Sequence, residues 1–148
     1  MARRNAHRLL SQIAEVRDIQ RQAAEAELMS ASLALRERQA AQADGAARLA
    51  SQHEQWISAL SEPSMNLGGM AVWGRAVGDA VRDLDALDRE VGDAEALKTS
   101  RAAALGQAQA RAEAMKVLEK AARRREARAR EEAVLADLAD RAALAVRR

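Results

Sequence analysis

Few side chains in this sequence have the types and spacing that catalysis or metal binding requires. The two histidines, His7 and His53, have no second ligand or base-orienting group at a useful helical spacing. The carboxylates are densest between residues 79 and 93, in a pattern typical of a solvated helix face. The sequence has no cysteine and no glycine-rich phosphate loop. We therefore expect a protein that is not an enzyme, holds no cofactor or metal ion, and acts through its surface.

The most concentrated charge lies in residues 116–131, KVLEKAARRREARARE, which contain Arg123, Arg124, Arg125, Arg128 and Arg130. One interpretation is a solvated helix, because Glu119 and Glu126 each stand four residues before an arginine, which favours ion pairs. A second is a nucleic-acid patch, which the interleaved glutamates and the lack of stacking aromatics weaken. A third is a binding site for an acidic protein surface.

The composition predicts long helices that position these arginines. The chain has 148 residues, of which 38 are alanine, and its only aromatic residues are Trp56 and Trp73. Alanine, leucine, arginine and glutamate are strong helix formers, whereas a globular core of this size needs large apolar side chains. We therefore expect an all-α chain.

Apolar residues recur at steps of three and four along two stretches, which predicts two helices that each carry one narrow contact stripe. The stripe expected on the first comprises Leu9, Ile13, Val16, Ala23, Ala26, Leu33, Ala40, Ala47, Ala50, Ile57 and Leu60. The stripe expected on the second comprises Val77, Val81, Leu84, Leu87, Val91, Ala94, Leu97, Leu105, Ala108, Ala112, Met115, Leu118 and Ala122.

The only proline marks the break between the two helices. Pro63 lacks an N–H and stops a helix, Asn66 is suited to cap the next one, and Gly68-Gly69 would allow a reversal. We expect one long antiparallel coiled-coil hairpin over residues 1–148, with helices at about 4–60 and 70–146 and a turn at 61–69. Position i of the first helix then faces roughly 129 minus i, which places Trp56 opposite Trp73.

Charge is distributed unevenly along this hairpin. Residues 61–100 carry four Lys/Arg and eight Asp/Glu, whereas residues 101–148 carry twelve and seven. Arg3, Arg4 and Arg8 would lie beside the arginine cluster, so the open end is basic. The N-terminus lacks an apolar run of signal-peptide length, and no segment approaches a membrane span. We expect a cytoplasmic protein that neither inserts into a membrane nor binds nucleic acid.

The chain resembles the FliJ/YscO family, the coiled-coil stalk proteins of flagellar and type III secretion export. The resemblance covers essentially the whole chain and is clearest in LLSQIAEVRDIQRQAAEAELMSASLAL, residues 9–35, and VLEKAARRREARAREEAVLADLADRAAL, residues 117–144. It implies paired terminal helices that insert into the ring of an export ATPase, promote its activity, and link it to the export gate protein and substrate chaperones at the cytoplasmic base of the apparatus.

The resemblance also implies site residues. The ATPase-facing end would comprise Leu9, Leu10, Ile13, Arg123, Arg124, Arg125, Arg128 and Arg130. The gate-facing stripe would comprise Trp73, Val77, Ala80 and Leu84, which are also good positions for the contact between the helices. We expect a monomer in isolation. The alternative is a structural or adaptor coiled coil unrelated to export.

Overall fold

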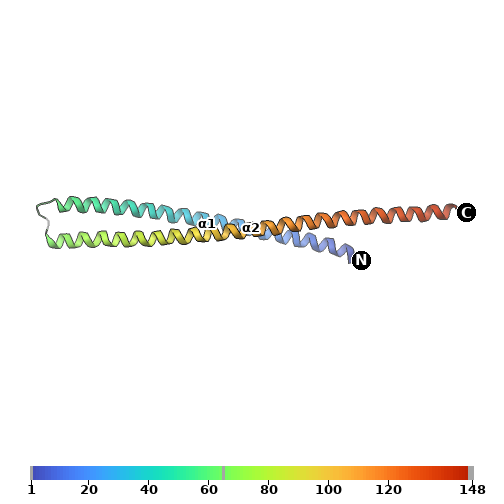
Figure 1. Cartoon of the computed structure of the whole chain (residues 1–148), viewed down its shortest axis with the longest axis horizontal. Helices are drawn as coiled ribbons and strands as arrows, with labels where there is room; N and C mark the ends of the chain where they lie inside the picture. Colours follow the sequence, from blue (N-terminus) through green and yellow to red (C-terminus); the bar gives the residue numbers. More distant parts are fainter. Residues whose placement is uncertain (1, 65, 147–148) are drawn as a thin grey trace. The chain divides into compact units, whose positions relative to one another are not determined.

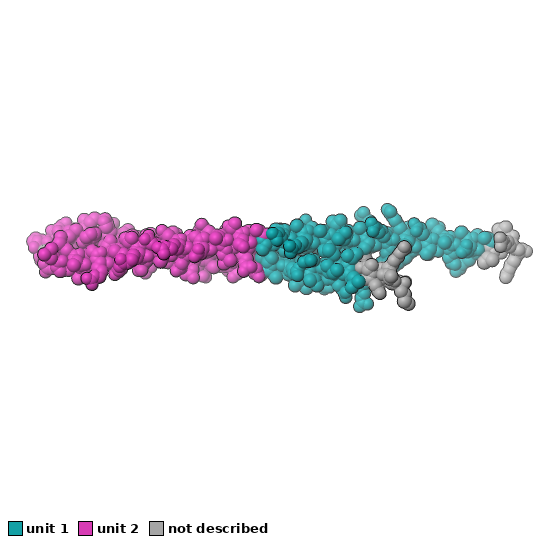
Figure 2. All heavy atoms as spheres, turned by 60° about the horizontal axis from the view of Figure 1, so that its bottom comes forward, with its two compact units in different colours: residues 1–25, 104–148 teal, residues 26–103 magenta. Residues whose placement is uncertain are grey.

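The computed structural model describes the backbone of residues 2–64 and 66–146, and the side chains of residues 8–64 and 66–143. It confirms the all-α class. Helix α1 runs over Ala2–Leu60 and helix α2 over Leu67–Val146, and the two pack against each other as a helical hairpin (Figure 1). The chain divides into two compact units, each with one stretch of α1 beside one stretch of α2 (Figure 2). One unit comprises residues 26–103, and the other comprises residues 1–25 and 104–148.

The connection between the helices occupies residues 61–66. The N–H groups of Ser61 and Glu62 donate to carbonyls three residues earlier, and Pro63 follows without an N–H to continue the helix. Asn66 caps α2, because its side-chain oxygen accepts a hydrogen bond of 2.9 Å from the N–H of Gly69. Gly68-Gly69 therefore lies in the first turn of α2 rather than in the reversal, and no described residue has a positive φ.

Within residues 26–103 the line of contact between the helices, here called the seam, follows steps of three and four, with one step of seven on each helix. Its buried and half-buried members on α1 are Leu28, Ala31, Leu35, Gln42, Gly45, Leu49, Gln52, Trp56 and Ala59. Those on α2 are Trp73, Val77, Ala80, Leu84, Leu87, Val91, Ala94 and Arg101. Such alternation is typical of a coiled coil.

Three polar pairs fix the antiparallel register of this unit. Arg38 donates to Glu90 at 2.6 Å, Gln42 donates to Asp88 at 2.7 Å, and Arg101 donates to Glu27 at 2.7 Å. In each pair, the residue on α2 is within one position of the residue that the 129 minus i relation predicts. The predicted register is therefore confirmed in residues 26–103.

The stripe predicted for the first helix is wrong. Every member of it is exposed, including Leu9, Leu33 and Ile57, which retain 56%, 58% and 52% of their accessible surface. The stripe predicted for the second helix is mostly confirmed, although Val81, Leu97 and Leu118 are exposed. On α1 the larger aliphatic residues form an additional exposed stripe, while the seam holds alanine, glycine and glutamine beside its leucines.

Gly45 shows why a small residue occupies the seam of α1. A Cβ added at Gly45 would lie 2.8 Å from Cδ1 of Leu87 and 3.7 Å from Cδ1 of Leu84. The side chain of Leu87 therefore occupies the space that a Cβ on α1 would fill. The absence of a side chain at Gly45 allows the two helices to approach closely here.

The two tryptophans both lie in the seam close to the turn. Trp56 and Trp73 are half-buried, as expected for residues that face the opposite helix. The ring that contacts Trp56 is His53, with centroids 6.3 Å apart in an edge-to-face arrangement. No ring contact joins the two indoles in the described part of the chain, so the tryptophans fill the seam without stacking on each other.

Candidate partner-binding surface at the paired helix ends

The unit formed by residues 1–25 and 104–148 pairs the beginning of α1 with the second half of α2. On α1 the seam continues as Leu10, Ala14, Arg17, Arg21 and Ala24, and on α2 as Leu105, Ala108, Ala112, Met115, Glu119, Ala122, Glu126 and Ala129. Only Ala14 and Ala112 are buried among the described residues of this unit. Small and charged side chains bury little apolar area, so this seam contributes little hydrophobic stabilisation.

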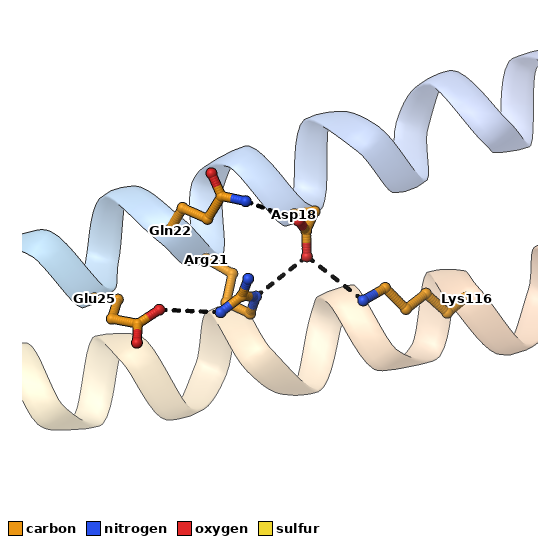
Figure 3. Close-up of polar contacts among 5 residues, drawn as sticks. All are labelled: Asp18, Arg21, Gln22, Glu25 and Lys116. Carbon is orange, nitrogen blue, oxygen red and sulfur yellow. Dashed lines mark hydrogen bonds and ion pairs between the residues drawn. The ribbon is translucent and has the colours of Figure 1, made fainter.

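A cluster around Asp18 holds the two helices in register here (Figure 3). The carboxylate accepts from Arg21 Nε at 3.2 Å and from Gln22 Nε2 at 3.0 Å on α1, and Lys116 Nζ on α2 lies 3.5 Å away. The hydrogen bond from Arg21 lowers the pKa of Asp18 below its ordinary value of 3.8, and Lys116 acts in the same direction while desolvation opposes it.

The lowered pKa of Asp18 predicts a pH-dependent contribution to stability. Because the folded chain favours the charged form, the stabilisation is present above the unfolded pKa and is lost as the pH falls through the folded pKa. We expect Asp18→Asn to be less stable than wild type at pH 7 and the difference to shrink below pH 3.8. Urea unfolding followed by circular dichroism at several pH values measures this. Glu113→Gln, which removes a carboxylate without an ion pair in the described residues, is the matched control.

An open groove lies beside this cluster, between α1 and α2. Its lining residues are Ser11, Ala14, Glu15, Asp18, Ile19, Gln22, Lys116 and Glu119. Most of its polar groups already have partners, since Asp18 bonds to Arg21 and Lys116, and Glu119 to Arg123. No group of histidines, cysteines and carboxylates able to hold a metal ion occurs among the described residues.

The ion pairs of this unit distinguish its two edges. In the sequence, Asp18 comes directly after the seam residue Arg17, and Lys116 directly after the seam residue Met115. Their side chains form an ion pair between the two helices. Residues that follow the seam on either helix therefore lie along one edge, here called the ion-pair edge. In an antiparallel pair, residues that directly precede the seam lie along the opposite edge.

That opposite edge carries exposed apolar side chains and is here called the apolar edge. Leu9, Ile13 and Val16 of α1 and Leu118 of α2 each precede a seam residue, and they retain 56%, 43%, 52% and 52% of their accessible surface. Contiguous exposed aliphatic residues are uncommon on a surface that meets only water and often mark a binding surface.

The five arginines predicted to face a partner divide among the two edges and the outer face of α2. Arg123 and Arg130 lie on the ion-pair edge and bond to Glu119 at 3.0 Å and to Glu126 at 2.6 Å. Arg125 and Arg128 lie on the apolar edge and Arg124 on the outer face of α2. These three are exposed and form no ion pair within the part of the chain that the structure describes. The side chains of Arg3 and Arg4 lie outside the described residues.

The expected gate-facing residues lie elsewhere in the hairpin. Trp73, Val77, Ala80 and Leu84 are all half-buried seam residues of the unit formed by residues 26–103. They face α1 and are not a free surface while the helices are paired. Exposed apolar residues near the turn are instead Leu67 and Val72, which retain 85% and 69% of their accessible surface.

The predicted helix bounds already leave the last described part of α2 beyond the end of α1, but no site residues were predicted there. Every residue of 131–143, here called the C-terminal segment, is exposed, including Val134, Leu135 and Leu138 at 59%, 66% and 56%. The signal was present, because the predicted 129 minus i register leaves α2 without an α1 partner beyond about residue 127. Apolar residues at steps of three and four past that point indicate a face that α1 cannot cover.

None of the helices is long and apolar enough to cross a membrane over the residues that the structure describes. Comparison with known proteins finds no family model that matches the chain, and neither a curated protein nor a solved structure has significant similarity to it.

Proposed function

We propose that this protein is a non-enzymatic stalk component of a flagellar-type export apparatus. Its paired N- and C-terminal helices insert into the ring of the export ATPase, promote ATP hydrolysis, and link the ring to the gate protein and substrate chaperones at the cytoplasmic base of the apparatus. The support is the resemblance of residues 9–35 and 117–144 to the FliJ/YscO family, together with the hairpin that places the first turns of these two segments beside each other.

The observation that carries the proposal is the composition of the apolar edge. Leu9, Ile13 and Leu118 offer exposed aliphatic surface, and Arg125 and Arg128 offer cations without an intramolecular ion pair in the described residues. Interfaces combine an apolar centre with charged groups at the rim, which speed and orient association. The ATPase contact therefore uses the apolar edge together with Arg124, rather than the ion-pair edge.

The gate contact needs residues that are exposed while the helices are paired. Trp73, Val77, Ala80 and Leu84 would reach a partner only if α2 separated from α1. Leu67 and Val72, at the start of α2, meet the requirement without any separation. We assign the gate contact to these two residues within the proposed function.

The test is ATP hydrolysis by the export ATPase of the same organism, titrated with the purified protein. We expect stimulation that saturates near one copy per hexamer. Arg124→Glu/Arg125→Glu/Arg128→Glu should raise the half-saturating concentration by roughly 100-fold, since three interfacial attractions become repulsions. The matched control is Arg36→Glu/Arg75→Glu/Arg89→Glu, which reverses three exposed arginines within residues 26–103 and should behave as wild type.

Two results would contradict the proposal in different ways. If the wild-type chain neither binds nor stimulates the ATPase, the export function is wrong and a structural or adaptor role takes its place. If both triple variants stimulate as well as wild type, the chain acts on the ATPase through a surface other than the apolar edge.

A further inference from the structure

The C-terminal segment has an apolar face that α1 does not cover. Helix α2 continues through these residues to Val146, yet every described side chain from 131 to 143 is exposed. Val134, Leu135 and Leu138 stand at i, i+1 and i+4, which places them on one side of the helix. Helical segments of this length are marginal in water without tertiary packing, so the helix gains stability when this face is covered.

The adjoining stretch of α2, residues 119–130, has the opposite charge and is here called the basic segment. It contains six Lys/Arg and two Asp/Glu, whereas the C-terminal segment contains four Asp/Glu and one Arg. Several of these charges have no ion pair among the described residues; they are Arg124, Arg125, Arg128, Glu131, Glu132 and Asp140. The same helix therefore carries a basic block followed directly by an acidic block, and each block includes exposed charges without an ion pair among the described residues.

We propose that two copies of this chain associate through an antiparallel contact of their α2 helices, centred between residues 130 and 131. In that arrangement the C-terminal segment of each copy lies along the basic segment of the other. The opposite charges meet twice, once on each side of a two-fold axis, which is the geometry of an isologous dimer. In this dimer the basic segment and the C-terminal segment of each copy both find a partner of opposite charge. An unrelated acidic helix would pair only with the basic segment, so a second copy covers more of the exposed charge.

The exposed leucines of the C-terminal segment are also covered in this arrangement. With the axis between residues 130 and 131, Leu135 and Leu138 of one copy lie level with residues 126 and 123 of the other. The alanines and the aliphatic stems of the arginines of the basic segment then cover these leucines.

This dimer goes beyond the proposed function and departs from the monomer expected from the sequence. It needs no ATPase, and a partner that binds the apolar edge would compete with the second copy. Sedimentation velocity of the purified full chain, without any partner, tests it. We expect a concentration-dependent equilibrium between a 16.0 kDa monomer and a species of twice that mass, shifted towards monomer by salt because the attraction is ionic.

Charge reversal distinguishes this contact from unspecific association. Arg124→Glu/Arg125→Glu/Arg128→Glu and Glu131→Lys/Glu132→Lys/Asp140→Lys should each raise the dimer dissociation constant by roughly 100-fold, because like charges then meet on both sides of the axis. An equimolar mixture of the two variants should restore a heterodimer. The control Arg36→Glu/Arg75→Glu/Arg89→Glu should dimerise as wild type.

The apolar part is tested with Leu135→Ser/Leu138→Ser against Leu33→Ser/Leu97→Ser, whose leucines are exposed within residues 26–103. The first pair should abolish the dimer and the second should preserve it, while circular dichroism verifies that both remain helical. A wild-type chain that stays monomeric at about 1 mM would overturn the proposal, as would a mixture of the charge-reversed variants that fails to associate. Neither result depends on whether the chain stimulates an ATPase.

Discussion

Leu35→Ala is expected to lower the free energy of unfolding by about 2–3 kcal/mol, since it removes a buried leucine and leaves a cavity in the seam. Leu35 retains only 7% of its accessible surface and belongs, with Ala31 and Val91, to the buried residues of the unit formed by residues 26–103. Urea unfolding followed by circular dichroism at 222 nm measures the change.

Leu33 supplies the matched control for this prediction. It is the same residue type, two positions away on the same helix, but it retains 58% of its accessible surface. Leu33→Ala should change stability by less than about 0.5 kcal/mol. Equal losses for the two variants would mean that the seam of α1 does not pass through Leu35, and a loss confined to Leu33→Ala would restore the stripe predicted from the sequence.

Trp56→Ala is expected to lower the free energy of unfolding by about 2–3 kcal/mol. This loss is smaller than for a fully buried tryptophan because Trp56 is half-buried. The substitution removes one of the two tryptophans of the seam near the turn, where Gln52 and Ala59 are its neighbours on α1. Ile57→Ala, at a position that retains 52% of its accessible surface, is the control and should cost far less.

Trp56→Phe separates the ring from its polar group. The indole Nε1 is buried, and no described residue accepts a hydrogen bond from it. An unpartnered buried donor is unfavourable, and phenylalanine has none, so this variant should lose less than about 1 kcal/mol. Thermal and urea unfolding of the three variants measure these differences. A loss in Trp56→Phe as large as that in Trp56→Ala would show that the indole N–H makes a stabilising bond.

The fold could be predicted from the sequence because its determinants are local. Pro63 ends one helix through its backbone chemistry and Asn66 begins the next through its side chain, and the stripe from Leu84 to Ala122 identifies most of the contact face of α2. The seam of α1 could not be predicted in the same way. Aliphatic residues such as Leu9 and Leu33 form a convincing stripe of their own, whereas the true seam includes Gly45, which fits only because Leu87 projects towards it.

The candidate site was predicted in part. The basic end and its arginines follow from composition and register, and Leu9 and Ile13 are exposed there. Which edge of the hairpin each arginine occupies depends on where the seam runs, and a single-helix pattern does not contain that information. The sequence indicates that Glu119 and Glu126 can pair with Arg123 and Arg130, and the structure shows that this leaves Arg124, Arg125 and Arg128 without ion pairs among the described residues.

The seam of residues 26–103 also determines the hand of the helix pair. From Leu28 to Trp56 its positions follow steps of three and four, with one step of seven between Leu35 and Gln42, so the mean is 3.5 residues per turn, whereas a straight α-helix has about 3.6. A straight helix would drift by about 20° per heptad, or about 80° over these four heptads, and Trp56 would leave the contact that Leu28 makes. Because both residues lie in the seam, the two helices must wind around each other with a left-handed supercoil.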